Sequence, residues 1–361
     1  MNANPATPDF SFSAPGTVLS AEQAMYLALE AARQGIRGAN PLVGAVIVDA
    51  DGALLSTGWH RGAGTAHAEA DALAKARQAG IDVRGAHMFV SLEPCNHTGR
   101  TGPCSHAIAQ AGITRVTFAY ADTTDDAAGG AAYLRQQGIA VHQGMLSQES
   151  EALNARWFAA AQRRRPFITA KIASTLDGKI AAADGTSQWI TGAQSRVDGH
   201  LIRARADAVL VGTATVVADN PALSARDAQG APFAKQPRAV VMGNRNIPGS
   251  AQLASSPNTL HLRTHDPLEV AGALYKHGVG HLMVEGGPTV LSAFLAADLV
   301  DEIFWYQAPK ILGAGRSALT DWGITTLHEA SGWQLDDLSM SPAISTLGTD
   351  ARMHLVPQSK R

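Results

Sequence analysis

Cysteine is scarce in this chain, with two among 361 residues. Two thiols cannot make a disulfide scaffold, so they are expected to be ligands, a nucleophile or buried groups. An excess of charge of one sign is also lacking, because 29 Lys and Arg residues face 31 Asp and Glu residues and the formal net charge is −2. That balance gives no electrostatic footprint for nucleic acid or for an anionic membrane surface.

Long apolar runs are missing too, since none approaches the roughly 18 residues that a membrane-spanning helix needs. The first 16 residues contain neither the basic start nor the apolar middle of a secretory signal. We therefore expect a cytoplasmic protein without a membrane partner, and a flexible tail over residues 1–18. The length exceeds what a single hydrophobic core usually serves, so two domains are expected.

Helical and strand patterns alternate along the chain up to about Gly144, which is typical of an α/β sandwich. A further helix is predicted to end at the basic run Arg163–Arg165, before Pro166. We interpret this run as the solvated last turn of the helix, where cations suit the macrodipole, rather than as a nucleic-acid contact. A second α/β series begins with FITAKIAS. The predicted domains are therefore 19–165 and 166–361.

Three short segments of the first half carry side chains that suit a zinc ion: His67 with Glu69, then Cys95, then Cys104. One imidazole and two thiolates leave a fourth zinc position open for water, whose pKa the metal lowers towards neutrality. Glu69 follows His67 by two positions on a predicted helix and points to a different side, so we expect it to move protons rather than bind metal.

The alternative is that these are two buried cysteines and a core histidine. Against it stands the combined arrangement H-x-E…P-C…C, which is the signature of zinc-dependent nucleobase deaminases. His97 and His106 are near enough in sequence to compete as ligands, but a site that stays open for water makes them substrate contacts or bystanders. A deaminase of nucleic-acid bases with an accessory domain remains a rival, although the neutral charge disfavours it.

The spacing of the two cysteines is unusual, because EPCNHTGRTGPC places a long Gly- and Thr-rich loop between them. With ANPLVGAVIV and GWHRGAGTAHAEADAL, this segment resembles the deaminase half of the bifunctional riboflavin-biosynthesis family. The resemblance implies a cytidine-deaminase-like αβα sandwich that binds a phosphoribosylaminopyrimidine. It also implies substrate contacts at Asn40, His60, His97 and Arg100. The chain departs from the family at ADTTDDAAGGAAYL, where an Asn and Pro residues are missing while Asp122 and Gly129–Gly130 remain.

The second half lacks the G-x-G-x-x-G fingerprint of ordinary dinucleotide-binding folds, and we interpret Gly313–Gly315 as a turn. The segment HLMVEGGPTVLSAFL has the form of a buried strand, a Gly-Gly-Pro turn and a helix. Glycines let backbone approach a ligand closely, and a helix N-terminus presents free N–H groups to phosphate. This segment could bind a phosphate, or it could be a tight turn alone.

Three further segments of the second half resemble the reductase half of the same family: KIASTLDGKIAAADGTSQWITG, RVDGHLIRARADAVLVGTATVVADNPALSAR and LVDEIFWYQAPKILG. The resemblance implies a dihydrofolate-reductase-like α/β domain that binds NADPH. The implied NADPH contacts are Ala173, Trp189, Thr215, Asp219, Gly287, Pro288, Thr289, Val290, Leu291, Ser292 and Ala293. The implied substrate contacts are Ser187, Arg203, Leu223, Arg226 and Glu285. Candidates for the reductase proton donor are Asp177, Lys179 and Glu285.

The resemblance spans about residues 19–320 in order, and it implies a bifunctional enzyme with Zn²⁺ and NADPH as cofactors. The first domain is expected to remove the 2-amino group of 2,5-diamino-6-ribosylamino-4(3H)-pyrimidinone 5′-phosphate by hydrolysis. The second is expected to reduce the ribosyl group to ribityl. A homo-oligomer is also expected. A second rival is a protein in which one half has lost activity, which the departure after Asp122 makes conceivable for the deaminase.

Overall fold

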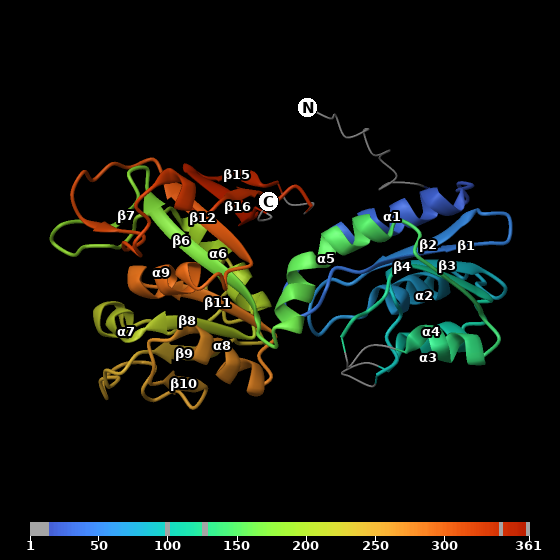
Figure 1. Ribbon diagram of the computed structural model, residues 1–361, viewed down its shortest axis with the longest axis horizontal. Helices are drawn as coiled ribbons and strands as arrows, with labels where there is room; N and C mark the ends of the chain where they lie inside the picture. Colours follow the sequence, from blue (N-terminus) through green and yellow to red (C-terminus); the bar gives the residue numbers. More distant parts are fainter. Residues whose placement is uncertain (1–13, 98–101, 125–128, 339–341, 359–361) are drawn as a thin grey trace. The chain divides into compact units, whose positions relative to one another are not determined.

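A computed structural model describes residues 14–97, 102–124, 129–338 and 342–358 (Figure 1). The chain divides into two compact units, of which the first runs to Ala159 and the second starts at Ala160. Because this division falls inside a helix, the domain boundary at Pro166 stays a prediction. Within the described ranges, no helix is both long and apolar enough to cross a membrane.

The first unit is a five-stranded sheet between two layers of helices (Figure 1). The strand order is β2-β1-β3-β4-β5; the pairs β1–β2 and β1–β3 are antiparallel, and β3–β4 and β4–β5 are parallel. The elements are α1 (Ala21–Arg33), β1 (Gly44–Val48), β2 (Leu54–Trp59), α2 (Ala68–Gln78), β3 (His87–Leu92), α3 (Cys104–Gln110), β4 (Arg115–Tyr120), α4 (Gly130–Gln136), β5 (Ala140–Gln143) and α5 (Ser147–Gln162).

Alternation along β1 explains why helices cover both faces of this sheet. Val46 and Val48 belong to the core under α1, whereas Ala45 and Ile47 belong to the core under α2, α3 and α4. All five residues of β1 are buried, as the apolar run predicts for a central strand. The fully buried strand therefore anchors the helical layer that carries the candidate zinc ligands.

Helix α1 begins directly after Ser20, which caps its N-terminus. The Ser20 hydroxyl accepts a hydrogen bond from the Gln23 backbone N–H, and the Gln23 side chain accepts one from the Ser20 backbone N–H. This capping box satisfies two donors that a helix N-terminus otherwise leaves free. Just before it, Gly16 and Thr17 of the expected tail exchange backbone hydrogen bonds with Leu54. Residues 1–13 of that expected tail lie outside the described residues.

The second unit is built on a nine-stranded sheet with the order β10-β9-β8-β11-β6-β12-β16-β14, and β15 also pairs with β16. In this sheet order, neighbouring strands from β10 through β9, β8, β11 and β6 to β12 are parallel, and β16 is antiparallel to β12. Its elements are β6 (Phe167–Thr175), β7 (Lys179–Ala181), α6 (Ala193–Arg205), β8 (Ala208–Gly212), α7 (Thr213–Asp219), β9 (Arg238–Met242), β10 (Thr259–Leu262), α8 (Pro267–Lys276), β11 (His281–Gly286), α9 (Pro288–Ala296), β12 (Glu302–Ala308), β13 (Arg316–Ser317), the 3₁₀ turn η1 (Leu327–Glu329), β14 (Trp333–Leu335), β15 (Ile344–Leu347) and β16 (Asp350–Pro357).

Two cores flank the parallel part of this sheet. Val270 and Leu274 of α8, with Phe294 of α9, pack on one face. Ile202 of α6 and Val216 of α7 pack on the other. Helices on both faces are what a parallel sheet requires, because its strands must be covered on each side. The two α/β units agree with the fold class expected from the sequence.

One interpretation of the sequence is wrong. Arg165 is not part of a solvated helix turn: α5 ends at Gln162, and Arg165 is only 7 % exposed. Its guanidinium donates two hydrogen bonds to the Asp301 carboxylate, of 2.6 and 2.8 Å. A long-range partner just before β12 therefore draws this arginine into the interior, which neighbouring residues could not reveal.

Candidate functional site

The candidate zinc ligands of the first unit come from three separate parts of the chain. His67 is the N-cap residue of α2, Cys95 lies in the loop after β3, and Cys104 is the first residue of α3. Gly58 of β2 lets α2 lie close to the sheet, since a Cβ there would come within 2.3 Å of the Ala68 carbonyl oxygen. Close packing of α2 thus sets the position of His67.

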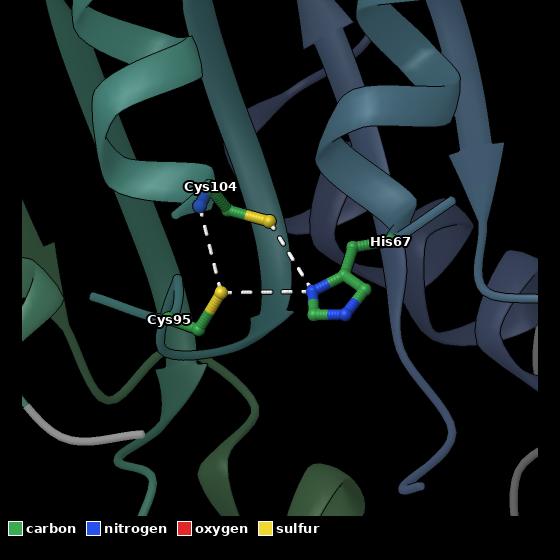
Figure 2. Close-up of side chains that lie close together, drawn as sticks. All are labelled: His67, Cys95 and Cys104. Atoms are coloured by element: carbon green, nitrogen blue, oxygen red, sulfur yellow. Dashed lines mark hydrogen bonds between the residues drawn. The ribbon is translucent and has the colours of Figure 1, made fainter. Parts of the chain in front are cut away.

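These three side chains point toward one another (Figure 2). Nδ1 of His67 lies 3.6 Å from Sγ of Cys95 and 3.4 Å from Sγ of Cys104. The backbone N–H of Cys104 also donates to Sγ of Cys95 over 3.5 Å. The three ligand atoms lie within 4.8 Å of one another, and among the described residues they form the one group of this kind.

The spacing of the group fits zinc. Bonds of about 2.3 Å to sulfur and about 2.0–2.1 Å to nitrogen, at a tetrahedral angle, put sulfur and nitrogen ligands roughly 3.6 Å apart. The observed nitrogen–sulfur distances of 3.4 and 3.6 Å are close to that value. A donor set of one imidazole and two thiols also favours the binding of zinc over that of magnesium or calcium.

The group favours a thiolate. Hydrogen bonds from Cys104 and His67 lower the pKa of the Cys95 thiol to about 4, although burial opposes the shift. The hydrogen bond with Cys95 and burial raise the pKa of Cys104, and the bond with Cys95 raises the pKa of His67. A thiolate is the form of cysteine that binds a metal ion.

Glu69 lies beside the group without belonging to it. Its side chain is 3 % exposed, and the ligand atoms that cluster among the described residues do not include its carboxylate. Burial raises the pKa of Glu69 to about 7, and the neighbouring Cys95 adds to the shift. A carboxyl group with this pKa can both accept and donate a proton near neutral pH.

Asn40 and His60, two expected substrate contacts, meet next to His67. Nδ1 of His60 lies 2.9 Å from the Ala66 carbonyl oxygen, so Nδ1 carries the hydrogen and Nε2 accepts from the Asn40 amide at 2.9 Å. The His60 ring lies edge-on to His67, with 5.3 Å between ring centroids. Both ring nitrogens of His60 are thus engaged inside the protein.

His97 and His106 do not belong to the ligand group found among the described residues. His106 stacks on Tyr133, with ring centroids 4.1 Å apart, and is not among the clustered ligand atoms of the described residues. His97 is exposed and follows Cys95 by two residues. Arg100, an expected substrate contact, lies outside the described residues.

Helix α4 packs against the loop that carries Cys95, an arrangement that sequence reasoning missed. The Ala131 backbone N–H donates to Oε1 of Glu93 over 3.0 Å. A Cβ on Gly130 would come within 1.7 Å of the Pro94 carbonyl oxygen, so only glycine allows this approach. The sequence signal for this packing was the glutamate directly before the Pro-Cys pair. The deaminase motif includes this glutamate but assigns it no role.

The segment that departs from the family pattern leads into this packing. Asp122 is buried and accepts hydrogen bonds from the backbone N–H and the hydroxyl of Thr124, of 2.9 and 2.6 Å. Residues 125–128 lie outside the described residues, and Gly129 then caps α4 in a left-handed conformation. The Asp and Gly residues that this chain shares with the family therefore lie at the two ends of the segment.

In the second unit the candidate residues gather where the parallel strands end. Glu285 lies near the end of β11, Thr215 lies in the first turn of α7 after β8, and Ala173 lies near the end of β6. Ligands of open α/β sheets bind beyond the carboxyl ends of the strands. This edge of the sheet is therefore the candidate site of the second unit.

Arg203 and Glu285 form a bidentate ion pair across this site. Nε of Arg203 donates to Oε1, and Nη2 donates to Oε2 at 2.7 Å. Burial opposes ionisation of Glu285, but the Arg203 guanidinium lowers the pKa of that carboxyl group to about 2. Lys171 of β6 lies beside the pair, and burial lowers its pKa while Glu285 opposes the shift. In the sequence, the signal for this residue was a lysine inside the otherwise apolar run FITAKIAS.

The stretch from Gly287 to Ala293 forms the start of α9. Pro288, Leu291 and Ser292 are buried, and Ser292 accepts from the Thr320 backbone N–H at 2.8 Å, whereas Thr289 is exposed. The first backbone N–H groups of a helix have no helical partner and suit a phosphate. Because Pro288 has no N–H and several side chains of this turn are buried, the backbone N–H groups after Pro288 are the groups of this turn that could contact a phosphate.

The other expected contacts lie in the connections between β7 and α6 and between α7 and β9, and at the end of α7. Ser187 and Trp189 lie between β7 and α6, and the Trp189 side chain is 62 % exposed. Leu223 is buried in the core under α6. Arg226 is exposed and its Nε donates to the Ser224 hydroxyl at 3.0 Å. Asp219 ends α7, and burial raises its pKa.

Comparison with known families divides the chain into two matched regions. Residues 19–120 match the cytidine and deoxycytidylate deaminase zinc-binding region, and residues 166–340 match the RibD C-terminal domain. The first region contains the His67, Cys95 and Cys104 group, so this is a zinc-binding deaminase region with a His/Cys/Cys cluster. The reductase domain implies a nicotinamide cofactor.

Relatives match over nearly the whole length. The riboflavin biosynthesis protein RibD of Mycobacterium tuberculosis is 41 % identical over 343 residues, which cover 94 % of this chain and 98 % of that protein. The protein of the same name from Escherichia coli is 36 % identical and covers 88 % of this chain and 93 % of its own length.

Solved structures agree with these relatives. Acinetobacter baumannii RibD superposes with a TM-score of 0.74 at 32 % identity, covering 94 % of this chain and 99 % of that one. A Thermotoga maritima diaminohydroxyphosphoribosylaminopyrimidine deaminase/5-amino-6-(5-phosphoribosylamino)uracil reductase gives 0.71 at 31 % identity, covering 93 % and 98 %. The chain belongs to the RibD family and is a bifunctional deaminase and reductase of riboflavin biosynthesis.

Proposed function

We propose that the first unit releases ammonia from 2,5-diamino-6-ribosylamino-4(3H)-pyrimidinone 5′-phosphate, and that the second unit then reduces the ribosyl side chain of the product to ribityl with NADPH. One observation carries the proposal: the His67, Cys95 and Cys104 group and the RibD C-terminal domain occur on the same chain. The Thermotoga maritima relative, whose title names both activities, supports the choice of substrate.

His67, Cys95 and Cys104 would hold zinc, as their 3.4 and 3.6 Å nitrogen–sulfur distances support. When bound, zinc supplies the Lewis acidity that lets water ionise near neutral pH. Glu69 takes the proton that this water loses. It passes that proton to the ring nitrogen, then takes the second proton of the same water oxygen, which is now bonded to the ring carbon, and passes it to the departing amino group, so that water is consumed and ammonia leaves.

In the first unit, Asn40, His60, His97 and Arg100 remain the proposed substrate contacts. Asn40 is supported by its hydrogen bond to His60, which holds its amide next to His67. Both ring nitrogens of His60 already take part in hydrogen bonds within the protein. The structure therefore supports a role for His60 in orienting Asn40 rather than in contacting the substrate with its ring.

In the second unit NADPH supplies a hydride when bound, and the chain supplies binding and orientation. The start of α9 and the exposed Trp189 face are the proposed contacts with cofactor phosphate and with an apolar part of the cofactor. Glu285, ionised beside Arg203, is available to accept hydrogen bonds from substrate hydroxyl groups. With Arg203 engaged by Glu285, the more exposed Arg226 is the better candidate for the substrate phosphate.

The proposal also includes a cytoplasmic location and a homo-oligomer. Two thiols that serve as metal ligands suit a reducing compartment. The rival activity on nucleic-acid bases gains no support, because the chain has a net charge of −2 rather than a basic excess.

Product masses test the proposal directly. The diaminopyrimidine substrate is incubated with the purified enzyme, with and without NADPH. We expect exchange of one amino group for oxygen in both reactions, and a further gain of two hydrogens only with NADPH. Deamination without any NADPH-dependent second step, or the reverse, would show that one half is inactive.

A further inference from the structure

Three connections meet at the carboxyl ends of β6 and β12. They are the turn 176–178 between β6 and β7, the connection 182–192 between β7 and α6, and the connection 309–315 between β12 and β13. The middle one carries Ser187 and Trp189, two of the proposed ligand contacts. What fixes this long connection is therefore important for the reductase half.

Lys310 ties the connection 182–192 to the end of β12. Its Nζ donates to the carbonyl oxygen of Trp189 at 2.9 Å and to that of Ile190 at 2.7 Å. The carbonyl oxygen of Lys310 accepts from the backbone N–H of Leu176 at 2.9 Å. One residue thus joins all three connections, and both of its ammonium contacts are charge-assisted bonds to backbone.

Asp177 holds the connection on which Lys310 lies. Its carboxylate accepts from the backbone N–H of Gly313 at 2.7 Å and of Leu312 at 3.2 Å, and from the Thr175 hydroxyl at 2.6 Å. The hydroxyl bond from Thr175 and these backbone bonds lower the pKa of Asp177. An ionised carboxylate whose oxygens already accept three donors has no proton to give to a substrate.

We propose that Lys310 and Asp177 are positioning residues of the reductase half, which act together as a backbone clamp. Asp177 fixes the connection 309–315, and Lys310, carried on that connection, fixes the backbone of Trp189 and Ile190. The clamp holds the Trp189 side chain where it meets NADPH, and neither residue transfers a proton. This inference rests on the proposed use of NADPH by the second unit.

The Arg196 side chain complements the clamp from α6. Its guanidinium lies 4.5 Å from the centre of the Trp189 ring, and Nη1 donates to the Thr191 carbonyl oxygen at 2.9 Å. Arg196 therefore supports the indole and the next peptide, whereas Lys310 supports the peptides of Trp189 and Ile190. Loss of Lys310 should loosen the connection without unfolding α6.

The first test compares Lys310→Met with Lys310→Arg in the full-length protein. Loss of two charge-assisted bonds at an exposed site should raise the Kd for NADPH about tenfold in Lys310→Met, with kcat at saturating NADPH little changed. Arginine can still donate to both carbonyl oxygens, so Lys310→Arg should recover most of the affinity. Lys235→Met is a matched control, because that lysine pairs with Asp207 in the same unit.

Hydrogen exchange without cofactor gives a second readout. Backbone amides of residues 182–192 should exchange faster in Lys310→Met than in wild type or Lys235→Met. Ammonia release by the first unit should be equal in all of them. Unchanged Kd and unchanged exchange in Lys310→Met would overturn the clamp. A lost kcat with unchanged Kd would instead assign Lys310 a direct chemical role and overturn it too.

Asp177→Asn separates positioning from proton transfer. The amide oxygen still accepts from backbone, so reduction at saturating NADPH should keep most of its rate and the same pH profile, with a moderate rise in Kd. A reduction rate lowered by about a hundredfold or more would instead make Asp177 the proton donor. If wild type itself binds no NADPH, the proposed function fails; if wild type binds and the variants match it, only the clamp fails.

Discussion

Individual side chains of the first site differ in what surrounds them. The two thiols and the imidazole are placed at the starts of helices and after a strand, where their donor atoms converge within 4.8 Å. Glu69 lies on α2 two residues after His67 and is buried, so its proton affinity is raised and it remains outside the ligand group. These different environments support the proposed roles, in which His67, Cys95 and Cys104 bind metal and Glu69 transfers protons.

Removal of one thiolate tests the metal site. We expect about one zinc per chain in the wild type and a loss of most of it in Cys95→Ser, because a hydroxyl is a much poorer zinc ligand than a thiolate. Metal analysis of the purified proteins measures this. His106→Gln is the control and should retain zinc, since His106 stacks on Tyr133 instead. Full zinc content in Cys95→Ser would remove Cys95 from the site.

The Glu69→Gln variant tests proton transfer. The amide keeps the size of the side chain but cannot carry the proton, so ammonia release should fall by at least about a hundredfold. Zinc content, and NADPH oxidation on substrate that is already deaminated, should barely change. Asp71→Asn on the same helix is the comparison, because Asp71 pairs with Arg61 and Lys75. Near-normal deamination in Glu69→Gln would end its assignment as the proton carrier.

At the scale of elements, packing rather than motif sets the geometry of both sites. Helix α2 lies on β2 because Gly58 permits it, and α4 lies on the Cys95 loop because Gly130 permits it. In the second unit the clamp of Lys310 and Asp177 connects three loops at one edge of the sheet. Each of these contacts joins elements that are distant in sequence.

Gly130→Ala tests how far α4 supports the metal centre. The added Cβ would lie 1.7 Å from the Pro94 carbonyl oxygen, so α4 or the Cys95 loop must shift. Overpacking of this kind costs about 1–3 kcal/mol in the free energy of unfolding. We expect a lower Tm for the first unit and faster zinc loss to a chelator.

Gly272→Ala in α8 is the matched control. Apart from the backbone of its own helix and its chain neighbours, no atom lies within 4 Å of its added Cβ, so the change should be neutral or stabilise α8 by up to about 1 kcal/mol. A Gly130→Ala protein with the wild-type Tm and the wild-type rate of zinc loss would show that α4 is not coupled to the metal ligands.

At the scale of the whole molecule, each unit has its own sheet, its own cores and its own group of candidate residues. The deaminase region and the reductase domain match separate parts of the chain, residues 19–120 and 166–340. Helix α5 packs on the first unit, where the Asn154 side chain exchanges hydrogen bonds with the backbone of Leu42. A fragment of the first unit should therefore keep all of α5.

Separate fragments test the independence of the two activities. Residues 1–162 should release ammonia without NADPH, and residues 163–361, which keep Arg165 together with Asp301, should reduce deaminated substrate without zinc, because each segment is long enough for its own core. Product masses distinguish the two steps. In the intact protein, reduction of deaminated substrate should survive zinc chelation. Reduction that disappears on chelation would show that the boundary or the roles are drawn wrongly.

Much of the architecture could be predicted because its signals are local. The Ser20 capping box, the buried run of β1 and the Gly-Gly-Pro turn before α9 each act within a few residues. Arg165 shows the limit: its neighbours Arg163, Arg164 and Pro166 suggest a solvated helix end. Its burial depends on Asp301, 136 residues away in the sequence.

The amino-acid sequence by itself determined the zinc-type ligand set, the adjacent carboxylate and the family, because these depend on residue types at short spacings. Only the tertiary structure decided which partner each polar group takes. Arg203 pairs with Glu285 across 82 residues, and Lys310 holds the backbone of Trp189 across 121. Such choices are made when strands and helices pack, since a buried charge or a free carbonyl is satisfied by whichever donor or acceptor the fold brings within hydrogen-bond distance.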